Sequence, residues 1–83
     1  MTKTERTDGV PLTELPIGEV ARIAHVDTPN RSLAYQLSSL GLTKGVEIRL
    51  NQRWPSYVLM CEETEIAIEE SIARTIFVTR DGR

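Results

Sequence analysis

A glycine-rich stretch, GLTKG at residues 41–45, has the composition of a phosphate-binding loop, with Lys44 beside its second glycine. Phosphate loops lead from a strand into the N-terminus of a helix, where free N–H groups meet the anion. Here a predicted helix precedes the glycines, so that carbonyl groups face the loop instead. The stretch therefore predicts structural glycines, with Gly41 ending the helix in a Schellman cap and Gly45 completing a type II turn.

Two other groups of residues have the types that bind metals or act as nucleophiles. His25 stands two residues before Asp27, and Cys61 is followed by Glu62, Glu63 and Glu65. A thiolate nucleophile needs a neighbouring base, and His25 is the single histidine of the chain. The patterns favour a structural or exposed histidine and a small buried cysteine before an acidic turn. We assign no catalytic residue and no metal ligand, and we expect no enzymatic activity.

The stretch from Arg53 to Tyr57, RWPSY, has the residue types that anchor protein–protein contacts. Tryptophan, tyrosine and arginine are enriched in interfaces and among the residues that contribute most binding energy. Arg53, Trp54 and Tyr57 are therefore the predicted partner-binding residues, with Tyr35 on the exposed face of the helix as a second site. In the alternative interpretation, Trp54 covers one end of a small core.

The composition limits the classes of protein to which the chain can belong. It has 83 residues, enough for one domain, with 40% hydrophobic and 27% charged residues, which is typical of a soluble globular protein. A net charge of −2 argues against binding nucleic acid through bulk positive charge. One cysteine excludes an intrachain disulfide and fits a cytoplasmic setting. No apolar stretch is long enough to span a membrane, and the polar first residues contain no secretory signal.

One helix should position these residues, over residues 29–40. Thr28 is the expected N-cap and Pro29 suits the first helical position. An apolar stripe marks the buried face of this helix at Leu33, Leu37 and Leu40.

Five short strands are expected around the helix. An entry segment, PLTELPIG, precedes them and ends in a turn at Gly18. Val20, Ile23 and Val26 cannot all face one side of a regular strand, which predicts a bulge or a strong bend in the first strand. The expected strands are 19–27, 46–54, 57–61, 65–69 and 74–79, with a helical turn at 69–73.

The remaining expectations concern the extent of the domain and its core. We expect residues 1–10 to be a disordered lead-in, 11–80 to be the folded domain, and 81–83 to be a loose tail. The predicted core consists of Leu15, Ile17, Val20, Ile23, Val26, Leu33, Leu37, Leu40, Leu42, Val46, Ile48, Leu50, Val58, Met60, Ile66, Ile68, Ile72, Ile76 and Val78.

Two motifs of the chain resemble those of the FeoA family, over about residues 11–79. The leader L-x-x-L-x-x-G and the helix-to-strand junction L-x-x-L-G-L-x-x-G are present as Leu12, Leu15 and Gly18, and as Leu37, Leu40, Gly41, Leu42 and Gly45. The chain departs from the family at Lys44, where proline is common, and at the short aromatic stretch RWPSYV, where the family often has a Pro-Leu-Gly-Asp-Pro-like loop.

The resemblance implies a mainly β fold: a small SH3-like barrel of five to six short strands with one inserted α-helix, at about residues 29–40. It implies a cytosolic accessory protein that binds and regulates the cytoplasmic part of a FeoB-type ferrous iron transporter, without inserting into the membrane. Independently of the resemblance, we expect no cofactor beyond weak binding of a divalent metal ion, no nucleic acid, and a monomer or weak homo-oligomer. The same barrel forms the C-terminal domain of DtxR-type repressors, but this chain has no winged-helix portion.

Two alternative functions stay open at this point. One is a metal-responsive module, binding Fe²⁺ or another divalent ion weakly through glutamates with His25 or Cys61. The other is a small nucleic-acid-binding barrel with a patch formed by Arg22, Arg49, Arg53 and Arg74.

Overall fold

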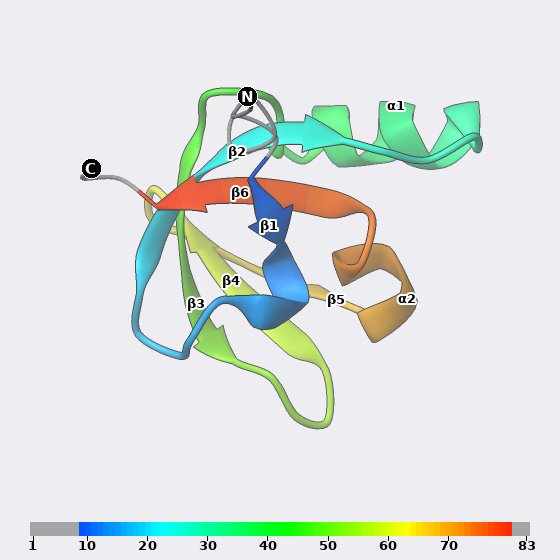
Figure 1. Ribbon diagram of the computed structural model, residues 1–83. Helices are drawn as coiled ribbons and strands as arrows, with labels where there is room; N and C mark the ends of the chain where they lie inside the picture. The colour runs from blue at the N-terminus through cyan, green and yellow to red at the C-terminus, as the bar shows by residue number, and fades with distance from the viewer. Residues whose placement is uncertain (1–8, 81–83) are drawn as a thin grey trace.

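An antiparallel sheet of six short strands, curled into a small barrel, makes up most of the structure (Figure 1). The computed structural model describes residues 9–80, so the first eight residues of the expected lead-in at 1–10 and the expected tail at 81–83 lie outside the described residues. The strands are β1 (Val10–Pro11), β2 (Val20–Val26), β3 (Glu47–Gln52), β4 (Tyr57–Cys61), β5 (Thr64–Ile68) and β6 (Ile76–Arg80), in the sheet order β1-β6-β2-β3-β4-β5. The helices are η2 (Leu12–Glu14), α1 (Arg31–Ser39) and α2 (Glu70–Ala73).

The mainly β class and the inserted helix agree with the sequence prediction, and β1 is the strand that the sequence did not predict. β1 pairs with β6, so Val10, expected in the lead-in, belongs to a strand. The predicted bulge is present in β2, where the pairing with β6 shifts between Ile23 and His25. None of the helices within residues 9–80 has the length and apolarity needed to cross a membrane.

Helix α1 begins two residues later than predicted. Its N-cap is Asn30, whose side chain accepts a hydrogen bond from the Leu33 N–H at 3.0 Å. The expected cap, Thr28, instead accepts a hydrogen bond from the Asn30 N–H at 3.1 Å. The start is corrected to Arg31 because asparagine caps a helix better than threonine and the Thr28 hydroxyl bonds only the backbone before the helix.

The C-terminus of α1 has the predicted Schellman cap. Gly41 has a φ of 91°, the Gly41 N–H donates to the Ser38 carbonyl, and the Leu42 N–H donates to the Leu37 carbonyl, both at 2.9 Å. Gly45 also has a φ of 91°, and the Val46 N–H donates to the Thr43 carbonyl at 3.1 Å. Both glycines are therefore structural, as the sequence indicated.

The main correction to the predicted core concerns β4. Its buried residues are Tyr57, Leu59 and Cys61, whereas Val58 and Met60, which were predicted to face inward, are half-buried on the outer face. Both faces of the segment YVLMC are apolar, so hydrophobicity alone did not choose between them. Pairing with β3 decides, because Leu59 lies opposite the buried Leu50.

Two further predicted core residues are exposed. Ile17 lies just before the turn at Gly18, and Leu40 is the C-cap residue of α1. Val20 is half-buried because Ala21 and Ile23 take the inner face of β2. The buried hydrophobic residues are Leu12, Leu15, Ala21, Ile23, Leu37, Leu42, Ile48, Leu50, Tyr57, Leu59, Cys61, Ile66, Ile68, Ala73, Ile76 and Val78. Val26, Leu33, Val46 and Ile72 pack against them.

Candidate protein-binding site

The loop between β3 and β4, residues 53–56, displays the most exposed large hydrophobic side chain within residues 9–80. Trp54 is 81% exposed. The side chain of the neighbouring Arg53 is half-buried and donates two short hydrogen bonds, to the carbonyl oxygens of Thr13 at 2.7 Å and Leu15 at 2.6 Å. These bonds join the loop to a segment about 40 residues earlier in the chain, so the exposed tryptophan stands on a loop that is fixed at its base.

Tyr57 does not belong to the exposed surface, which corrects the sequence prediction. It is the first residue of β4, lies opposite Ile68 of β5, and is only 6% exposed. The guanidinium carbon of Arg53 lies 5.8 Å from the centre of its ring, within the range of a cation–π contact. Tyr57 thus supports Arg53 from the core, and Arg53 in turn supports the loop that carries Trp54.

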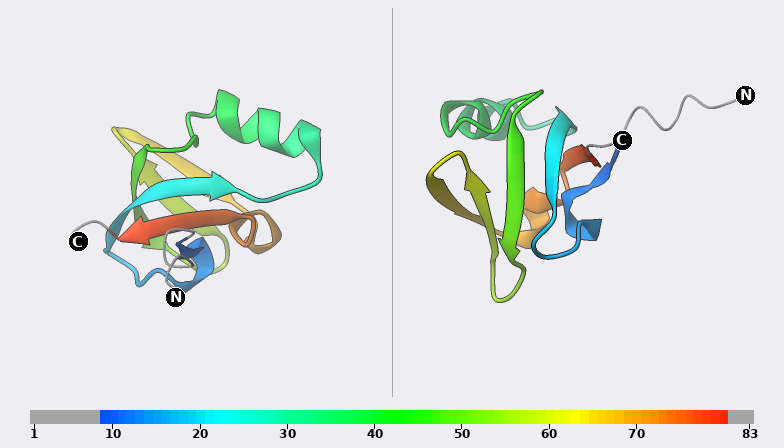
Figure 2. Two further views of the ribbon diagram at one scale, coloured as in Figure 1. Left: turned by 45° about the horizontal axis from the view of Figure 1, so that its top comes forward. Right: turned by 90° about the vertical axis from the view of Figure 1, so that its left-hand side faces the viewer.

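A second exposed hydrophobic residue lies at the same end of the barrel. Ile17, predicted to be in the core, is 57% exposed in the turn before β2. The Gly18 N–H donates to the Leu50 carbonyl at 2.7 Å, which fixes this turn beside β3. Figure 1 and the right-hand view of Figure 2 both place the turn and the 53–56 loop at one end of the molecule. We call this surface, defined by Ile17 and Trp54, the Trp54 end.

Tyr35, the second predicted contact, is 77% exposed on α1. Leu37 is the one fully buried residue of this helix, so α1 rests on the barrel along one side and presents Tyr35 on the other. Helix α1 lies at the end of the molecule opposite the Trp54 end (Figures 1 and 2). The structure therefore separates the two predicted contact sites.

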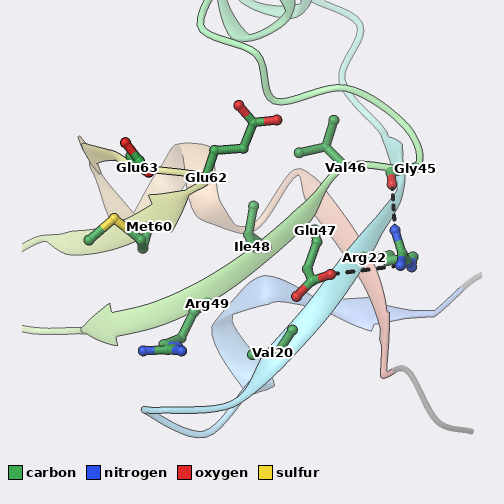
Figure 3. Close-up of a pocket in the computed structure, with 10 residues that line it drawn as sticks. All are labelled: Val20, Arg22, Gly45, Val46, Glu47, Ile48, Arg49, Met60, Glu62 and Glu63. Carbon is green, nitrogen blue, oxygen red and sulfur yellow. Dashed lines mark hydrogen bonds and ion pairs between the residues drawn. The ribbon is translucent and has the colours of Figure 1, made fainter.

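An open groove of about 940 Å³ crosses the outer face of β2, β3 and β4 (Figure 3). Arg22 donates a hydrogen bond to the Gly45 carbonyl at 3.1 Å and forms an ion pair with Glu47 at 3.7 Å. The lining residues are Val20, Arg22, Gly45, Val46, Glu47, Ile48, Arg49, Met60, Glu62 and Glu63. The groove mixes both signs of charge with an apolar floor, so it has no preference for an anion or a cation.

The candidate metal ligands of the described residues do not gather into one metal-binding cluster. His25 stacks on Phe77, with ring centres 4.8 Å apart and planes within 5°. Burial, and to a lesser extent the negative charge of Glu62, raises the pKa of the Cys61 thiol, which disfavours the thiolate. In the described part of the chain, no three side chains of the metal-binding types come together.

The four arginines of the nucleic-acid alternative do not form one patch. Arg22 and Arg49 line the groove, and Arg53 is bonded to the entry segment. Arg74 on α2 pairs with Glu70 at 3.1 Å. The positive charges are thus distributed over three surfaces, and most of them have an acidic or carbonyl partner.

Residues 10–80 match a family model described as the FeoA domain. Among solved structures, FeoA of Stenotrophomonas maltophilia, complexed with zinc, is 29% identical with a TM-score of 0.71, and the match covers 81% of this chain and 86% of that chain. That protein is described as a procaryotic SH3 domain protein, with a suggested role as a bacterial ferrous iron transport activating factor.

Two further solved structures resemble the barrel. IdeR of T. acidophilum is 26% identical with a TM-score of 0.81, and the match covers 87% of this chain but 34% of that one, so the chain spans about a third of IdeR. FeoA of Chlorobium tepidum, at 21% identity and a TM-score of 0.81, shares the fold over 88% of this chain and 71% of that chain. A search of curated proteins finds no match.

Proposed function

Because this chain belongs to the FeoA family, we propose that it is a cytoplasmic, non-enzymatic accessory protein of ferrous iron uptake. In this proposal it binds the cytoplasmic part of a FeoB-type transporter and regulates transport. Two observations support the proposal: the family model matches nearly the whole described chain, and a role as a ferrous iron transport activating factor has been suggested for a zinc-complexed FeoA of similar length.

The surface that we assign to the transporter is the Trp54 end. A tryptophan buries about 150–250 Å² when it is covered, and such residues often dominate the energy of an interface. Trp54 leaves most of its surface in water within residues 9–80, and the turn at the same end of the barrel exposes Ile17. Covering both side chains with a partner would remove this apolar surface from water.

The hydrogen bonds of Arg53 make this surface more favourable for binding. Ordering a loop on binding reduces affinity, since the loss of conformational freedom opposes the favourable interactions with the partner. The two bonds from Arg53 to Thr13 and Leu15 have already fixed the base of the loop in the free protein. Arg53 is therefore a positioning residue, and Trp54 is the contact residue.

The test is a binding measurement with the purified cytoplasmic part of the FeoB-type transporter from the same organism. We expect Trp54→Ala to weaken binding at least tenfold, which corresponds to about 1.4 kcal/mol. Tyr35→Ala is the matched control, since it also removes an exposed aromatic ring but from the opposite end of the molecule. Unchanged binding by Trp54→Ala would remove the Trp54 end from the proposal, and no binding by the wild type would overturn the partner.

A further inference from the structure

Strand β5 is an open edge of the sheet. It is the last strand in the sheet order and pairs with β4 alone among the described strands. In the right-hand view of Figure 2 the β4–β5 hairpin lies at the outer side of the barrel, with no strand beyond it. Glu65 and Ala67 are exposed, whereas Ile66 and Ile68 are buried, so the strand is anchored through every second residue.

The register shows which backbone groups of β5 point outward. In β3, the Leu50 N–H donates to the Glu19 carbonyl, and the Leu50 carbonyl accepts from the Gly18 N–H, so both backbone groups of Leu50 face β2. Because successive residues of a strand direct their backbone groups to opposite sides, the N–H and C=O of Arg49 face β4. Arg49 pairs with Met60, which leaves the groups of Leu59 facing β5, where they meet Ile66. The backbone groups of Ile66 therefore face β4. Those of its two neighbours, Glu65 and Ala67, point to the opposite side, away from the sheet.

These outward groups have no hydrogen-bond partner within residues 9–80. A strand with free N–H and C=O groups along one side is a template for an added strand, unless it is blocked by proline or covered. β5 contains no proline and spans five residues, and among the described strands only β4 pairs with it.

The charge of this edge indicates the kind of strand that it can accept. Residues 54–73 include five glutamates and no lysine, arginine or histidine. Glu70 is paired with Arg74, but Glu62, Glu63, Glu65 and Glu69 have no ion-pair partner in the part of the chain that the structure describes. The acidic side chains thus flank the outward backbone groups from the turn before β5 to the residue after it.

We propose that β5 binds an extended basic segment of a partner protein, which adds to the sheet as a seventh strand. Its backbone would bond the outward groups of Glu65 and Ala67. Lysine or arginine at alternate positions would lie on the outer face beside Glu65, and apolar residues between them would extend the face of Ile66 and Ile68.

The same observations disfavour a second copy of the chain as the occupant. Two β5 strands could pair antiparallel around a two-fold axis. The N–H and C=O of both Glu65 and Ala67 are then all used only when this axis passes through Ile66. That register sets Glu63 of each copy opposite Glu69 of the other, and Glu62 toward Glu70. The like charges would repel each other at both ends of the short strand.

This proposal does not depend on the transporter, because it rests on the outward backbone groups of Glu65 and Ala67 and not on Trp54, so the two tests can fail independently. The probe is the peptide acetyl-KVKVKVK-amide, titrated into the full-length isotope-labelled protein and followed by NMR. We expect shifts confined to β5 and its flanks, with slowed amide exchange at Glu65 and Ala67. The peptide acetyl-KGKGKGK-amide has the same charge but low strand propensity, and it should bind at least tenfold more weakly.

Two variants separate strand addition from simple charge attraction. Ala67→Pro removes an outward N–H that β4 does not use, so the fold should be retained while peptide affinity falls at least tenfold. Ala67→Val keeps the N–H and should bind as the wild type does. The proposal is overturned if both variants bind alike, if the two peptides bind equally, or if the shifts lie outside β5 and its flanks. If Ala67→Pro fails to fold, the test is the amide hydrogen exchange of Glu65 and Ala67 in the wild type, measured with and without the peptide. Equal exchange rates in the two states would overturn the proposal.

Discussion

The two connections at the ends of β4 join neighbouring antiparallel strands, but they are held in opposite ways. At its start, the 53–56 loop is bonded to Thr13 and Leu15 through the Arg53 side chain. At its end, two residues reverse the chain, and Glu62 takes a φ of 59°, a conformation that favours glycine. One connection is stabilised by distant contacts, and the other is a tight turn that carries local strain.

The difference matches what each end displays. The bonded loop holds an exposed aromatic side chain in place, which suits a contact that must be well positioned. The strained turn carries Glu62 and Glu63 to the start of β5, the edge for which we propose a basic partner strand. Both the 53–56 loop and the turn at Glu62 depend on β4. Substitutions in the strand, and then in each connection, should therefore show whether the two ends are held differently.

The largest effect should come from the strand itself. Leu59 is fully buried at the middle of β4, between Leu50 of β3 and Ile66 of β5. Leu59→Ala should lower the free energy of unfolding by about 3 kcal/mol, since it removes buried methyl groups and leaves a cavity. Urea unfolding measures this loss, and hydrogen exchange should show both connections of β4 becoming less protected.

Val58→Ala is the control, because Val58 lies on the outer face of the same strand and is half-buried. It should cost about 1 kcal/mol or less. Equal losses for the two variants would mean that the inner face of β4 is wrongly assigned.

The second largest loss of stability should come from a substitution in the loop at the start of β4, without loosening the turn at its end. Arg53→Ala removes both hydrogen bonds to the entry segment and leaves the carbonyl of the buried Leu15 without that donor. We expect a loss of about 2 kcal/mol in the free energy of unfolding. Trp54 fluorescence anisotropy should also fall in the native state, as the loop becomes more mobile. Unchanged anisotropy would show that Arg53 does not position Trp54.

Arg53→Lys separates geometry from charge at the same position. A lysine keeps the charge but cannot present the planar fork that serves the carbonyls of Thr13 and Leu15 together. We expect its stability to lie between those of the wild type and Arg53→Ala.

Local sequence patterns predicted the elements that depend on local physics. The glycines at 41 and 45 were assigned correctly because a helix end and a type II turn each need positive φ at one position. The bulge in β2 followed from an apolar pattern that no regular strand can bury on one face. β1 was missed because it has two residues and depends on pairing with β6, far along the chain.

The candidate site was less predictable, since its organisation depends on contacts between distant segments. The sequence predicted Trp54 and Arg53 as contact residues, but it did not predict that Arg53 donates to carbonyls 38 and 40 residues away. Tyr57 was placed on the surface because the run YVLMC gives no alternation to assign its faces. Ile17 stands between Pro16 and Gly18, and this turn composition was the signal that it is exposed.

A substitution in the strained turn at the end of β4 should increase stability, in contrast to the substitutions at Leu59 and Arg53. Glu62→Gly should raise the free energy of unfolding by about 0.5 kcal/mol, since glycine adopts positive φ without the steric cost. Glu63→Gly is the matched control: Glu63 is not among the described residues with positive φ, so the change should destabilise by about 0.5–1 kcal/mol. A loss of stability in Glu62→Gly would show that the turn is not strained.

The smallest effect concerns the thiol beside this turn. Burial first, and Glu62 second, raise the pKa of Cys61 above its ordinary value of 9.0. Above that pH the unfolded chain loses the thiol proton while the folded chain keeps it, so stability falls as pH rises through this interval. Cys61→Ala has no such thiol. The free energy of unfolding of the wild type, measured relative to that of Cys61→Ala by urea unfolding, should therefore decrease above about pH 9. Glu62→Gln should remove the smaller part of the pKa shift, and an unchanged pKa in that variant would separate the turn from the thiol.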